Sequence, residues 1–196
     1  MPSPSLPDEV NRVETQSEEE LLSRARAGDG EAFRVIFNRE APGVRRFLGD
    51  LLRDDAAADE ATQETFVRAH QRLSTLSDAV KLQGWLMGIA RLVFMEQLRQ
   101  KRRDGPQLPD EPVQVDRGPT PEAALLSGEA DQVLAVALAE LATERRAALL
   151  MRIDHDLDYR EIAEAMGWTL QKVKNEIHRA RLQLRARLAT YLAGAA

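Results

Sequence analysis

The sequence contains no cysteine and few aromatic residues, which occupy 5% of its 196 positions. The absence of cysteine excludes a disulfide framework, a thiol nucleophile and most zinc sites. Strand-favouring residues are scarce, whereas Ala, Leu, Arg and Glu are abundant, so the composition predicts an all-α protein. No apolar run approaches the length of a membrane span, and the first residues lack the basic start and apolar core of a signal peptide. We therefore expect a soluble cytoplasmic protein without membrane insertion.

The sequence also lacks the motifs of common catalytic and metal sites. It has no phosphate-binding glycine loop and no serine in a nucleophile elbow. The alternating Asp154, Asp156 and Asp158 lack the glycine and the terminal glutamate that a calcium loop requires. The histidines stand in separate segments without metal-ligand spacing. The sequence predicts surface positions for all three, which are His70, His155 and His178. These absences predict a protein that is not an enzyme and needs neither a metal nor another cofactor.

The negative net charge is confined to one end of the chain. The formal net charge is −5, and residues 1–20 alone carry six acidic residues and one arginine. The rest of the chain is therefore neutral and can present local basic surfaces. Residues 1–16 are also rich in Pro and Ser, so we expect them to form a disordered acidic tail.

Helical periodicity and capping signals predict four helices in the next part of the chain. Ser17 and Glu20 form a capping box for the first helix. Asp29 starts the second, in which Pro42 is expected to produce a kink or a break. The third helix is predicted over about 56–73, and its buried side consists of Thr62, Phe66, Ala69 and Leu73. The fourth ends in the basic sequence RQKRR, and its inward side consists of Leu82, Trp85, Leu86, Ile89 and Val93.

Residues 104–122 interrupt this helical pattern. They contain five of the nine prolines and have no helical period, so they are predicted to form an acidic, flexible linker. The predicted helices downstream begin at Thr120-Pro121, Thr143, Asp158 and Thr169. The whole pattern predicts two small helical domains, an N-terminal bundle over 17–103 and a C-terminal domain over 123–192, joined by this linker.

The segment 158–188 has the spacing of a helix–turn–helix. Ile162, Ala163 and Met166 form the inner side of a short helix, and Gly167 can adopt the left-handed conformation that ends a helix abruptly. Three- and four-residue steps predict the packed side of the helix that follows. That side consists of Leu170, Val173, Ile177, Ala180, Leu184 and Leu188.

The opposite side of this second helix carries long polar residues suited to base edges and phosphates. From Thr169 to Leu188 the segment holds six basic residues and one acid, as binding in a DNA groove requires. A solvated amphipathic helix would also explain the charges, but the short helix, the glycine turn and the basic second helix occur together and favour DNA binding. The predicted DNA-contacting residues are Thr169, Gln171, Lys172, Lys174, Asn175, Glu176 and Arg179.

Ordered blocks of sequence at matching separations carry a family resemblance. They are SEEELLSRARAGDGEAF (17–33), DEATQETFVRAH (59–70), WLMGIARLVFMEQLRQKRR (85–103), LDYREIAEAMG (157–167) and IHRARLQL (177–184). Over about residues 17–190 the chain resembles the RNA polymerase sigma factors of the extracytoplasmic-function (ECF) type, in the sigma-70 family. The resemblance implies one domain that binds core polymerase and opens the minus-ten element, and a second that reads the minus-35 element.

The resemblance also implies site residues in the N-terminal domain. The clamp helices of the largest polymerase subunit would bind the third helix through Asp59, Glu60, Gln63, Glu64 and Phe66. Without the resemblance, acids in a first helical turn would simply complement the helix dipole. Minus-ten DNA would bind the fourth helix through Arg91, Leu92, Glu96, Arg99, Arg102 and Arg103. The preceding loop, about 74–84, would capture an extruded base, whereas the spacing of Trp85 predicts a core residue.

Four positions depart from the family pattern. Leu92 stands where Asn is common, Glu96 stands where Asp is common, and Gly88 occupies a place that is often basic or polar. Glu176 stands where the family often has Arg. A carboxylate there cannot bind a phosphate, but it can accept a hydrogen bond from the amino group of cytosine. These departures predict a shifted promoter preference.

Two other functions remain open at this point. The main alternative is an ordinary helix–turn–helix transcriptional regulator whose N-terminal helices dimerise or sense a ligand. A further alternative is that the second domain is a protein-interaction module. The sigma-factor interpretation predicts RNA polymerase core and promoter DNA as partners and, by family likeness, an anti-sigma factor.

Overall fold

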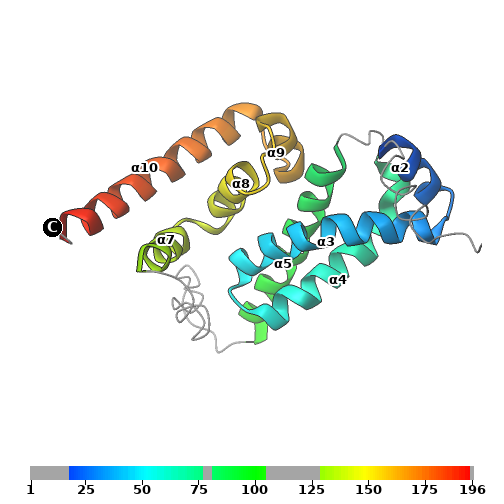
Figure 1. Ribbon diagram of the computed structural model, residues 1–196. Helices are drawn as coiled ribbons and strands as arrows, with labels where there is room; N and C mark the ends of the chain where they lie inside the picture. Colours follow the sequence, from blue (N-terminus) through cyan, green and yellow to red (C-terminus); the bar gives the residue numbers. More distant parts are fainter. Residues whose placement is uncertain (1–17, 77–80, 105–128, 195–196) are drawn as a thin grey trace, which may run out of the picture.

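The fold is known from a computed structural model that describes residues 18–76, 81–104 and 129–194. Every regular element in these ranges is helical, as Figure 1 shows. The elements are α2 (Glu18–Arg26), α3 (Gly30–Leu52), α4 (Asp55–Arg72), the 3-10 turn η1 (Leu73–Thr75), α5 (Leu82–Asp104), α7 (Glu129–Ala139), α8 (Thr143–Ile153), α9 (Tyr159–Met166) and α10 (Leu170–Gly194). The predicted all-α fold is confirmed. The predictions that fall outside the described residues concern the tail 1–16, the Ser17 cap, the linker beyond residue 104 and the helix start at Thr120-Pro121.

The N-terminal half, α2–α5, is a bundle in which α3 packs against α2, α4 and α5, and α4 packs against α5. The predicted cap Asp29 opens α3, and its carboxylate accepts hydrogen bonds from the backbone N–H groups of Glu31 and Ala32 at 3.0 and 3.2 Å. Asp54 opens α4 and accepts from the N–H of Ala57 at 2.9 Å. Both carboxylates satisfy amide groups that have no partner within the first helical turn.

The predicted core sides of α4 and α5 are confirmed with one exception. The buried residues are Thr62, Phe66, Ala69 and Leu73 of the third predicted helix and Leu82, Leu86, Ile89 and Val93 of the fourth. Trp85 is only partly buried and packs at the edge of the core. Met87, Phe94 and Leu98 of α5 are buried as well, because α3, α4 and α9 cover different sides of this helix. A helix covered on several sides has no single apolar stripe.

Of the kink or break predicted at Pro42, the break does not occur. The helix continues from Gly30 to Leu52 with the exposed Pro42 inside it. A proline removes its own N–H from the helical ladder and crowds the carbonyl four residues earlier, so other contacts must hold the helix together there. The residues beyond it, Val44, Phe47 and Leu48, are fully buried, and this packing holds the second part of the helix in place.

The C-terminal half, α7–α10, is organised by α10, which packs against α7, α8 and α9. Helix α8 begins at Thr143, and Ala142 occupies its N-cap position without a side-chain hydrogen bond. The prediction that Thr143 caps this helix is therefore wrong. The first turn closes one residue earlier, where the N–H of Arg146 donates to the carbonyl of Ala142 at 2.9 Å, and the acidic Glu144 complements the helix dipole there.

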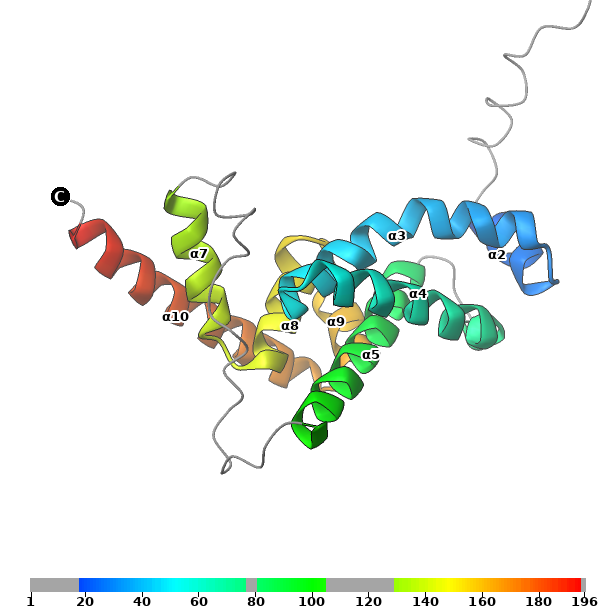
Figure 2. The same cartoon turned by 90° about the horizontal axis from the view of Figure 1, so that it is seen from below.

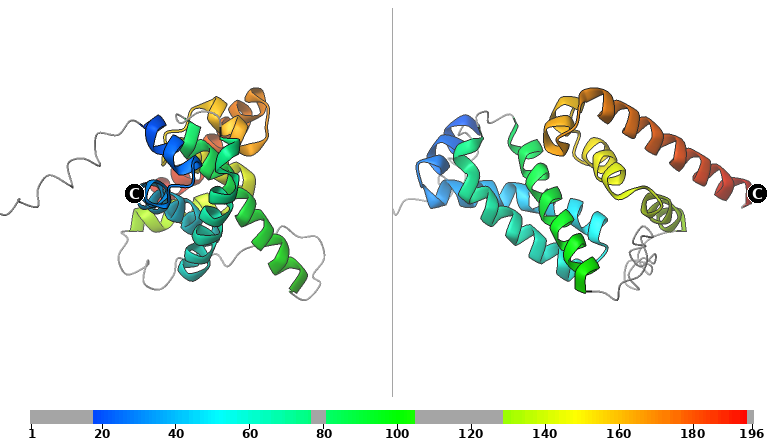
Figure 3. Two further views of the ribbon diagram at one scale, coloured as in Figure 1. Left: turned by 90° about the vertical axis from the view of Figure 1, so that its right-hand side faces the viewer. Right: turned by 180° about the vertical axis from the view of Figure 1, so that it is seen from behind.

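The two halves lie in direct contact. Helix α9 packs across α5, and α8 lies against α3, as the views in Figures 2 and 3 show. The buried apolar side chains of both halves form one continuous cluster. Within this contact, Nη2 of the buried Arg146 donates to the carbonyl of Leu51 at 2.8 Å. By contrast, the C-terminal part of α10 extends away from the N-terminal half (Figure 1).

His155 is buried at this contact, so its predicted surface position is wrong. Its side chain comes from the C-terminal half and covers Gly43 of α3, and its ring meets that of Phe47 edge to face with centroids 5.8 Å apart. Burial lowers the pKa of His155, and its Nε2 atom has no hydrogen-bond partner. His70 and His178 are exposed, as predicted.

Within the described ranges, no helix combines the length and apolarity that crossing a membrane requires. Within the same ranges, no three His, Asp or Glu side chains gather where they could hold a metal ion.

Candidate nucleic-acid interface

Helix α9 and the start of α10 form the predicted helix–turn–helix. Asp158 opens α9 with a capping box, in which its carboxylate accepts from the N–H groups of Arg160 and Glu161 at 2.6 and 2.9 Å. Gly167 ends α9 at a φ of 64°, which glycine adopts without the steric cost that a β-carbon imposes. The hydroxyl of Thr169 then caps α10 by accepting from the N–H of Lys172 at 3.2 Å. These local bonds set the path of the chain into α10.

The packed side of α10 follows the predicted pattern from its second turn onward. Val173, Ile177 and Ala180 are buried, and the more distal leucines of the pattern are partly buried. Leu170 is 38% exposed, so its predicted burial is wrong, because it stands at the turn ahead of the covered stripe. The outward side of α10 is exposed, and its exposed predicted site residues are Thr169, Gln171, Lys172, Lys174, Asn175 and Arg179.

Several residues of this outward side are oriented before any ligand binds. The Nζ atom of Lys172 lies 4.1 Å from the centroid of the Trp168 ring, a cation–π contact that restrains the ammonium group without neutralising it. The amide nitrogen of Gln171 donates to Oδ1 of Asn175 at 3.0 Å. Side chains that are already ordered lose less conformational entropy when they bind a ligand.

Glu176 is engaged with other residues of the C-terminal half. Its carboxylate accepts from Nε of Arg145 at 2.7 Å and from Nη1 of Arg179 at 3.2 Å, and its side chain is 16% exposed. Arg145 also donates to Oε1 of Gln183 at 2.7 Å. The hydrogen bond from Arg145 lowers the pKa of Glu176. Glu176 therefore links α8 to α10 and places a guanidinium at the edge of the outward side.

The predicted minus-ten residues lie along α5. Leu92, Arg99 and Arg103 are exposed, and the Arg102 side chain falls outside the described set. Glu96 accepts from Nη2 of Arg68 of α4 at 2.7 Å, and this bond lowers the pKa of Glu96.

Arg91 differs from the other α5 cations because another helix covers it. Its Nη2 atom lies 2.5 Å from Oε1 of Glu144 in α8, and its side chain is 14% exposed. The residue that the sequence places at minus-ten DNA is therefore paired with a carboxylate of the opposite half.

The predicted polymerase-binding residues share one side of α4. Asp59, Glu60 and Gln63 are exposed, and Glu64 is half-buried. Asp59 accepts from Nε of Arg45 at 2.6 Å, and Glu64 accepts from Nε of Arg68 at 2.7 Å. These bonds leave the exposed part of the face polar and mostly acidic.

Phe66, the remaining predicted member of this set, points into the bundle. It is 3% exposed, and its ring meets that of Phe37 edge to face with centroids 4.8 Å apart. It therefore supports α4 from beneath and contributes no surface of its own.

Comparisons with known proteins agree with this arrangement. The family model described as Sigma-70 region 2 matches residues 36–104, and the one described as Sigma-70, region 4 matches residues 131–184. RNA polymerase sigma factor YlaC of Bacillus subtilis is 31% identical, over 65% of this chain and 75% of its own length. The ECF RNA polymerase sigma factor SigC of Mycobacterium tuberculosis is 30% identical, over 82% of this chain and 85% of its own length. The chain belongs to the ECF type of the sigma-70 family.

A solved sigma factor has the same fold. The sigma factor RpoE of Bartonella quintana, in complex with the anti-sigma factor NepR, superimposes with a TM-score of 0.64 at 21% identity, over 80% of this chain and 96% of that one. The resemblance seen in the sequence is thereby confirmed. The family consists of transcription-initiation factors, which are not enzymes.

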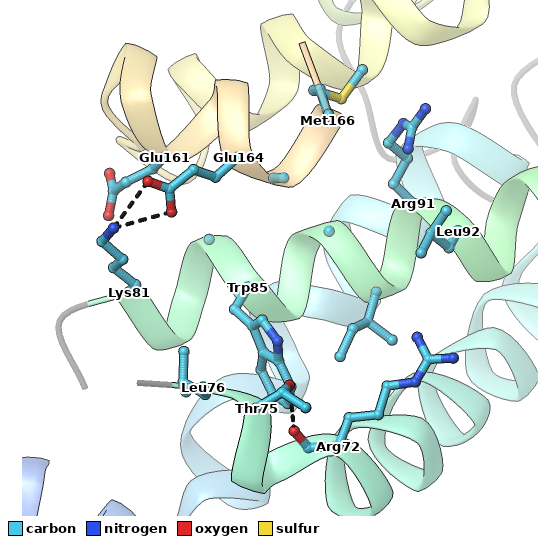
Figure 4. Close-up of a pocket in the computed structure, with 15 residues that line it drawn as sticks. Arg72, Thr75, Leu76, Lys81, Trp85, Arg91, Leu92, Glu161, Glu164 and Met166 are labelled. Atoms are coloured by element: carbon cyan, nitrogen blue, oxygen red, sulfur yellow. Dashed lines mark hydrogen bonds and ion pairs between the residues drawn. The ribbon is translucent and has the colours of Figure 1, made fainter. Parts of the chain in front are cut away.

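In the present chain, a cavity of about 650 Å³ lies between α5 and α9 (Figure 4). Its lining includes Arg72, Trp85, Arg91, Leu92 and Met166. Beside it, Nζ of Lys81 lies 2.9 Å from Oε1 of Glu164 in α9. Trp85, for which the spacing predicts a core position, is thus a half-buried wall of a cavity shared by both halves.

Gly88 permits the close crossing of α5 and α9. A β-carbon at this position would lie 3.2 Å from the α-carbon of Ala165 and 3.3 Å from its carbonyl oxygen, which is closer than ordinary van der Waals contact. The departure from the family pattern at Gly88 therefore has a structural consequence, because any larger residue would push α9 away from α5.

Sequence reasoning did not select several residues that shape these surfaces. Glu144 and Arg145 carry no local signal, because their partners Arg91 and Glu176 lie on other helices. Arg146 does carry a signal, since it precedes Leu150 by four residues on the apolar side of α8, where a charged residue is unusual.

Proposed function

We propose that this sigma factor directs RNA polymerase core to specific promoters and initiates transcription there. One observation carries the proposal: the α9–Gly167–α10 unit presents an exposed basic side of a helix that is anchored by its opposite, buried side. A helix held in this way can enter a major groove with its polar side chains toward the bases.

For the minus-35 element, we assign the residues of α10 by their chemistry. Lys172, Lys174 and Arg179 carry the charge that phosphates require. Thr169, Gln171 and Asn175 carry the hydroxyl and amide groups that can read base edges.

Glu176 has a different role in this proposal. Both of its carboxylate oxygens already accept charge-assisted hydrogen bonds, Oε2 from Arg145 and Oε1 from Arg179, and these bonds fix the orientation of both partners. We assign Glu176 as a positioning residue that orients Arg179 on the outward side.

The N-terminal half would bind the polymerase and the minus-ten element. The polar face of α4, formed by Asp59, Glu60, Gln63 and Glu64, suits a basic partner surface on the clamp helices. The cationic residues of α5, Arg91, Arg99, Arg102 and Arg103, suit the phosphates of a separated promoter strand. In this scheme residues 17–103 and 123–192 are the two functional units, and residues 104–122 connect them.

We further propose that the chain binds an anti-sigma factor. RpoE of Bartonella quintana is solved with the anti-sigma factor NepR, and the two sigma factors share a fold.

Transcription in vitro tests the proposed function. Purified core polymerase, with and without this chain, is supplied with a promoter library, and the transcripts are sequenced. Selective initiation only when both proteins are present is the expected result. An ordinary helix–turn–helix regulator would instead bind its operator without core and would give core no new start sites.

A further inference from the structure

We propose that the cavity between α5 and α9 is a binding site for a small aromatic acid, a flat ring system that carries one anionic group. Its volume of about 650 Å³ lies within the range of about 300–1,000 Å³ that is usual for small-molecule sites. Both halves of the chain line it, and such sites occur preferentially where two packed units meet. The inference goes beyond the proposed function, because its ligand is a free small molecule.

The wall of the cavity is apolar and contains one aromatic ring. Trp85 of α5 is half-buried, and Figure 4 shows its indole among the other lining side chains. Leu76, Ile89 and Leu92 add aliphatic surface, and Met166 of α9 adds a thioether, a group that makes favourable contacts with aromatic rings. A flat ring that enters the cavity can stack on the indole and remove apolar surface of both from water.

Most charged groups of the lining already have partners. Nζ of Lys81 lies 2.9 Å from a carboxylate oxygen of Glu164, and the carboxylate of Glu161 accepts from the backbone N–H of Asp158 at 2.7 Å. The guanidinium of Arg72, by contrast, makes no hydrogen bond or ion pair with any residue that the structure describes. The charge that remains available in the lining is therefore positive, and it favours an anionic ligand.

Arg91 adds an unsatisfied donor to this available charge. Its Nη2 atom is engaged by Glu144, but its Nε atom is buried without a hydrogen-bond partner. A buried N–H group without an acceptor is destabilising, and an oxyanion can supply that acceptor while Glu144 keeps Nη2. Figure 4 shows Arg72 and Arg91 on the same side of Trp85. The anionic group of the ligand is therefore directed toward these two guanidiniums, with the ring system on the indole.

The test uses two fluorescent dyes that differ in one group. Anilinonaphthalene sulfonate carries a sulfonate, whereas phenylnaphthylamine has the same ring systems and no charge. Titration of each dye with the full-length chain should give a single site for the sulfonate dye. Its affinity should exceed that of the neutral dye by at least about tenfold, because only the sulfonate accepts charge-assisted hydrogen bonds from the two guanidiniums.

Variants of the lining assign each part of the ligand. Arg72→Gln and Arg91→Gln should each weaken binding of the sulfonate dye by about three- to tenfold and leave the neutral dye unaffected. Trp85→Leu should weaken both dyes to a similar degree, because it removes the stacking surface and keeps the cations. Arg91→Gln also breaks the pair with Glu144, so Arg72→Gln, an exposed change that breaks no pair, is the decisive variant.

Lys101→Gln is the matched control. Lys101 is an exposed cation of the same helix, α5, and it lies outside the lining of the cavity. This variant removes the same charge as Arg72→Gln and should leave the affinity for both dyes unchanged. Equal losses of sulfonate binding in Lys101→Gln and Arg72→Gln would overturn the inference, because the dye would then respond to net charge alone.

Two further results would also overturn it. Equal affinity of the wild type for the two dyes would show that the cavity selects no anion. Undiminished binding of the sulfonate dye to Trp85→Leu would place the dye outside the cavity. Because these titrations use the chain without polymerase, either result leaves the proposed function intact, and transcription in vitro tests that function separately.

Discussion

The outward side of α10 and the cationic side of α5 are both basic, yet they are presented differently. The cations of α10 are exposed, and Lys172 is held in place by the ring of its near neighbour Trp168. Arg91 of α5 is covered, and its partner Glu144 comes from the other half of the molecule. Lys172 and Arg91 carry the same charge, and the residues that contact them decide how far each is exposed.

Under the proposed function, this difference predicts two modes of DNA binding in one chain. The α10 surface is built by caps, a glycine turn and a buried stripe that lie within about thirty residues of sequence, so it is ready in the free protein. The α5 surface includes Arg91, which Glu144 of α8 covers, so its presentation depends on how the two halves pack. The experiments below sharpen or break this contrast, from the largest expected effect to the smallest.

The largest effect concerns the polar face of α4, which is exposed although the two halves are in contact. Replacing Gln63 and Glu64 together with Ala should weaken binding to core polymerase by at least about tenfold, because a polar contact face loses two central side chains. Sedimentation of labelled chain with core measures this binding.

The control for that experiment is Asn38→Ala, an exposed change on α3. Circular dichroism of the double variant should match the wild type. Normal holoenzyme assembly by the double variant would show that the polymerase binds elsewhere.

The next effect separates two roles of Glu176. If it positions Arg179 through the network with Arg145, then Glu176→Gln and Arg145→Gln should each reduce the ratio of specific to non-specific minus-35 binding by about three- to tenfold, and the double variant should lose little more. Competition binding of the holoenzyme against a library of minus-35 sequences measures this ratio. A change with Glu176→Gln alone, limited to one cytosine, would instead identify Glu176 as a base-reading residue.

A smaller effect distinguishes the exposed Lys172 of α10 from the covered Arg91 of α5. Lys172→Ala should reduce the slope of log K against log salt by about one, because one phosphate contact is lost. Trp168→Leu keeps the charge and should leave the slope unchanged while lowering affinity slightly. Arg91→Ala should leave the slope for the minus-35 duplex unchanged, because Arg91 is paired with Glu144 and is assigned to the separated minus-ten strand. A slope reduced by about one in Arg91→Ala as well would end the contrast.

The smallest effect is the dependence of stability on pH through His155. Burial lowers the pKa of His155, so the structure with the two halves in contact favours the neutral ring. The contribution of His155 to stability is therefore complete above the ordinary value of 6.5 and is lost as the pH falls below it. Asp154 and Arg46 face this ring with opposite effects on its pKa. The midpoint of urea unfolding should therefore decrease slightly from pH 7.5 to 5.5.

His155→Phe isolates that effect, since it retains an aromatic ring but cannot titrate. Asp50, whose pKa is raised by burial and then by Asp154, acts in the opposite direction as the pH falls, and its contribution remains in this variant. A pH profile identical in the wild type and His155→Phe would exclude the histidine as its source.

Local signals in the sequence predicted most of the secondary structure and the helix–turn–helix. Asp29, Asp158 and Thr169 cap the helices that they were predicted to open, and Gly167 has the predicted left-handed conformation. These interactions join residues a few positions apart, so the pattern of residue types is enough to find them. The predictions for Thr143 and Leu170 are wrong at helix starts, where Thr143 is the first helical residue after the cap and Leu170 precedes the covered stripe.

The sequence by itself determined an all-helical chain, a basic recognition helix and the family to which the chain belongs, because each depends on short-range spacing or on ordered blocks. The tertiary structure alone decided that His155 is buried, that Glu176 is held by Arg145 and that Glu144 covers Arg91. The physical reason is that these partners are separated by many residues along the chain. Their pairing depends on how two helices cross, and no local periodicity encodes that crossing.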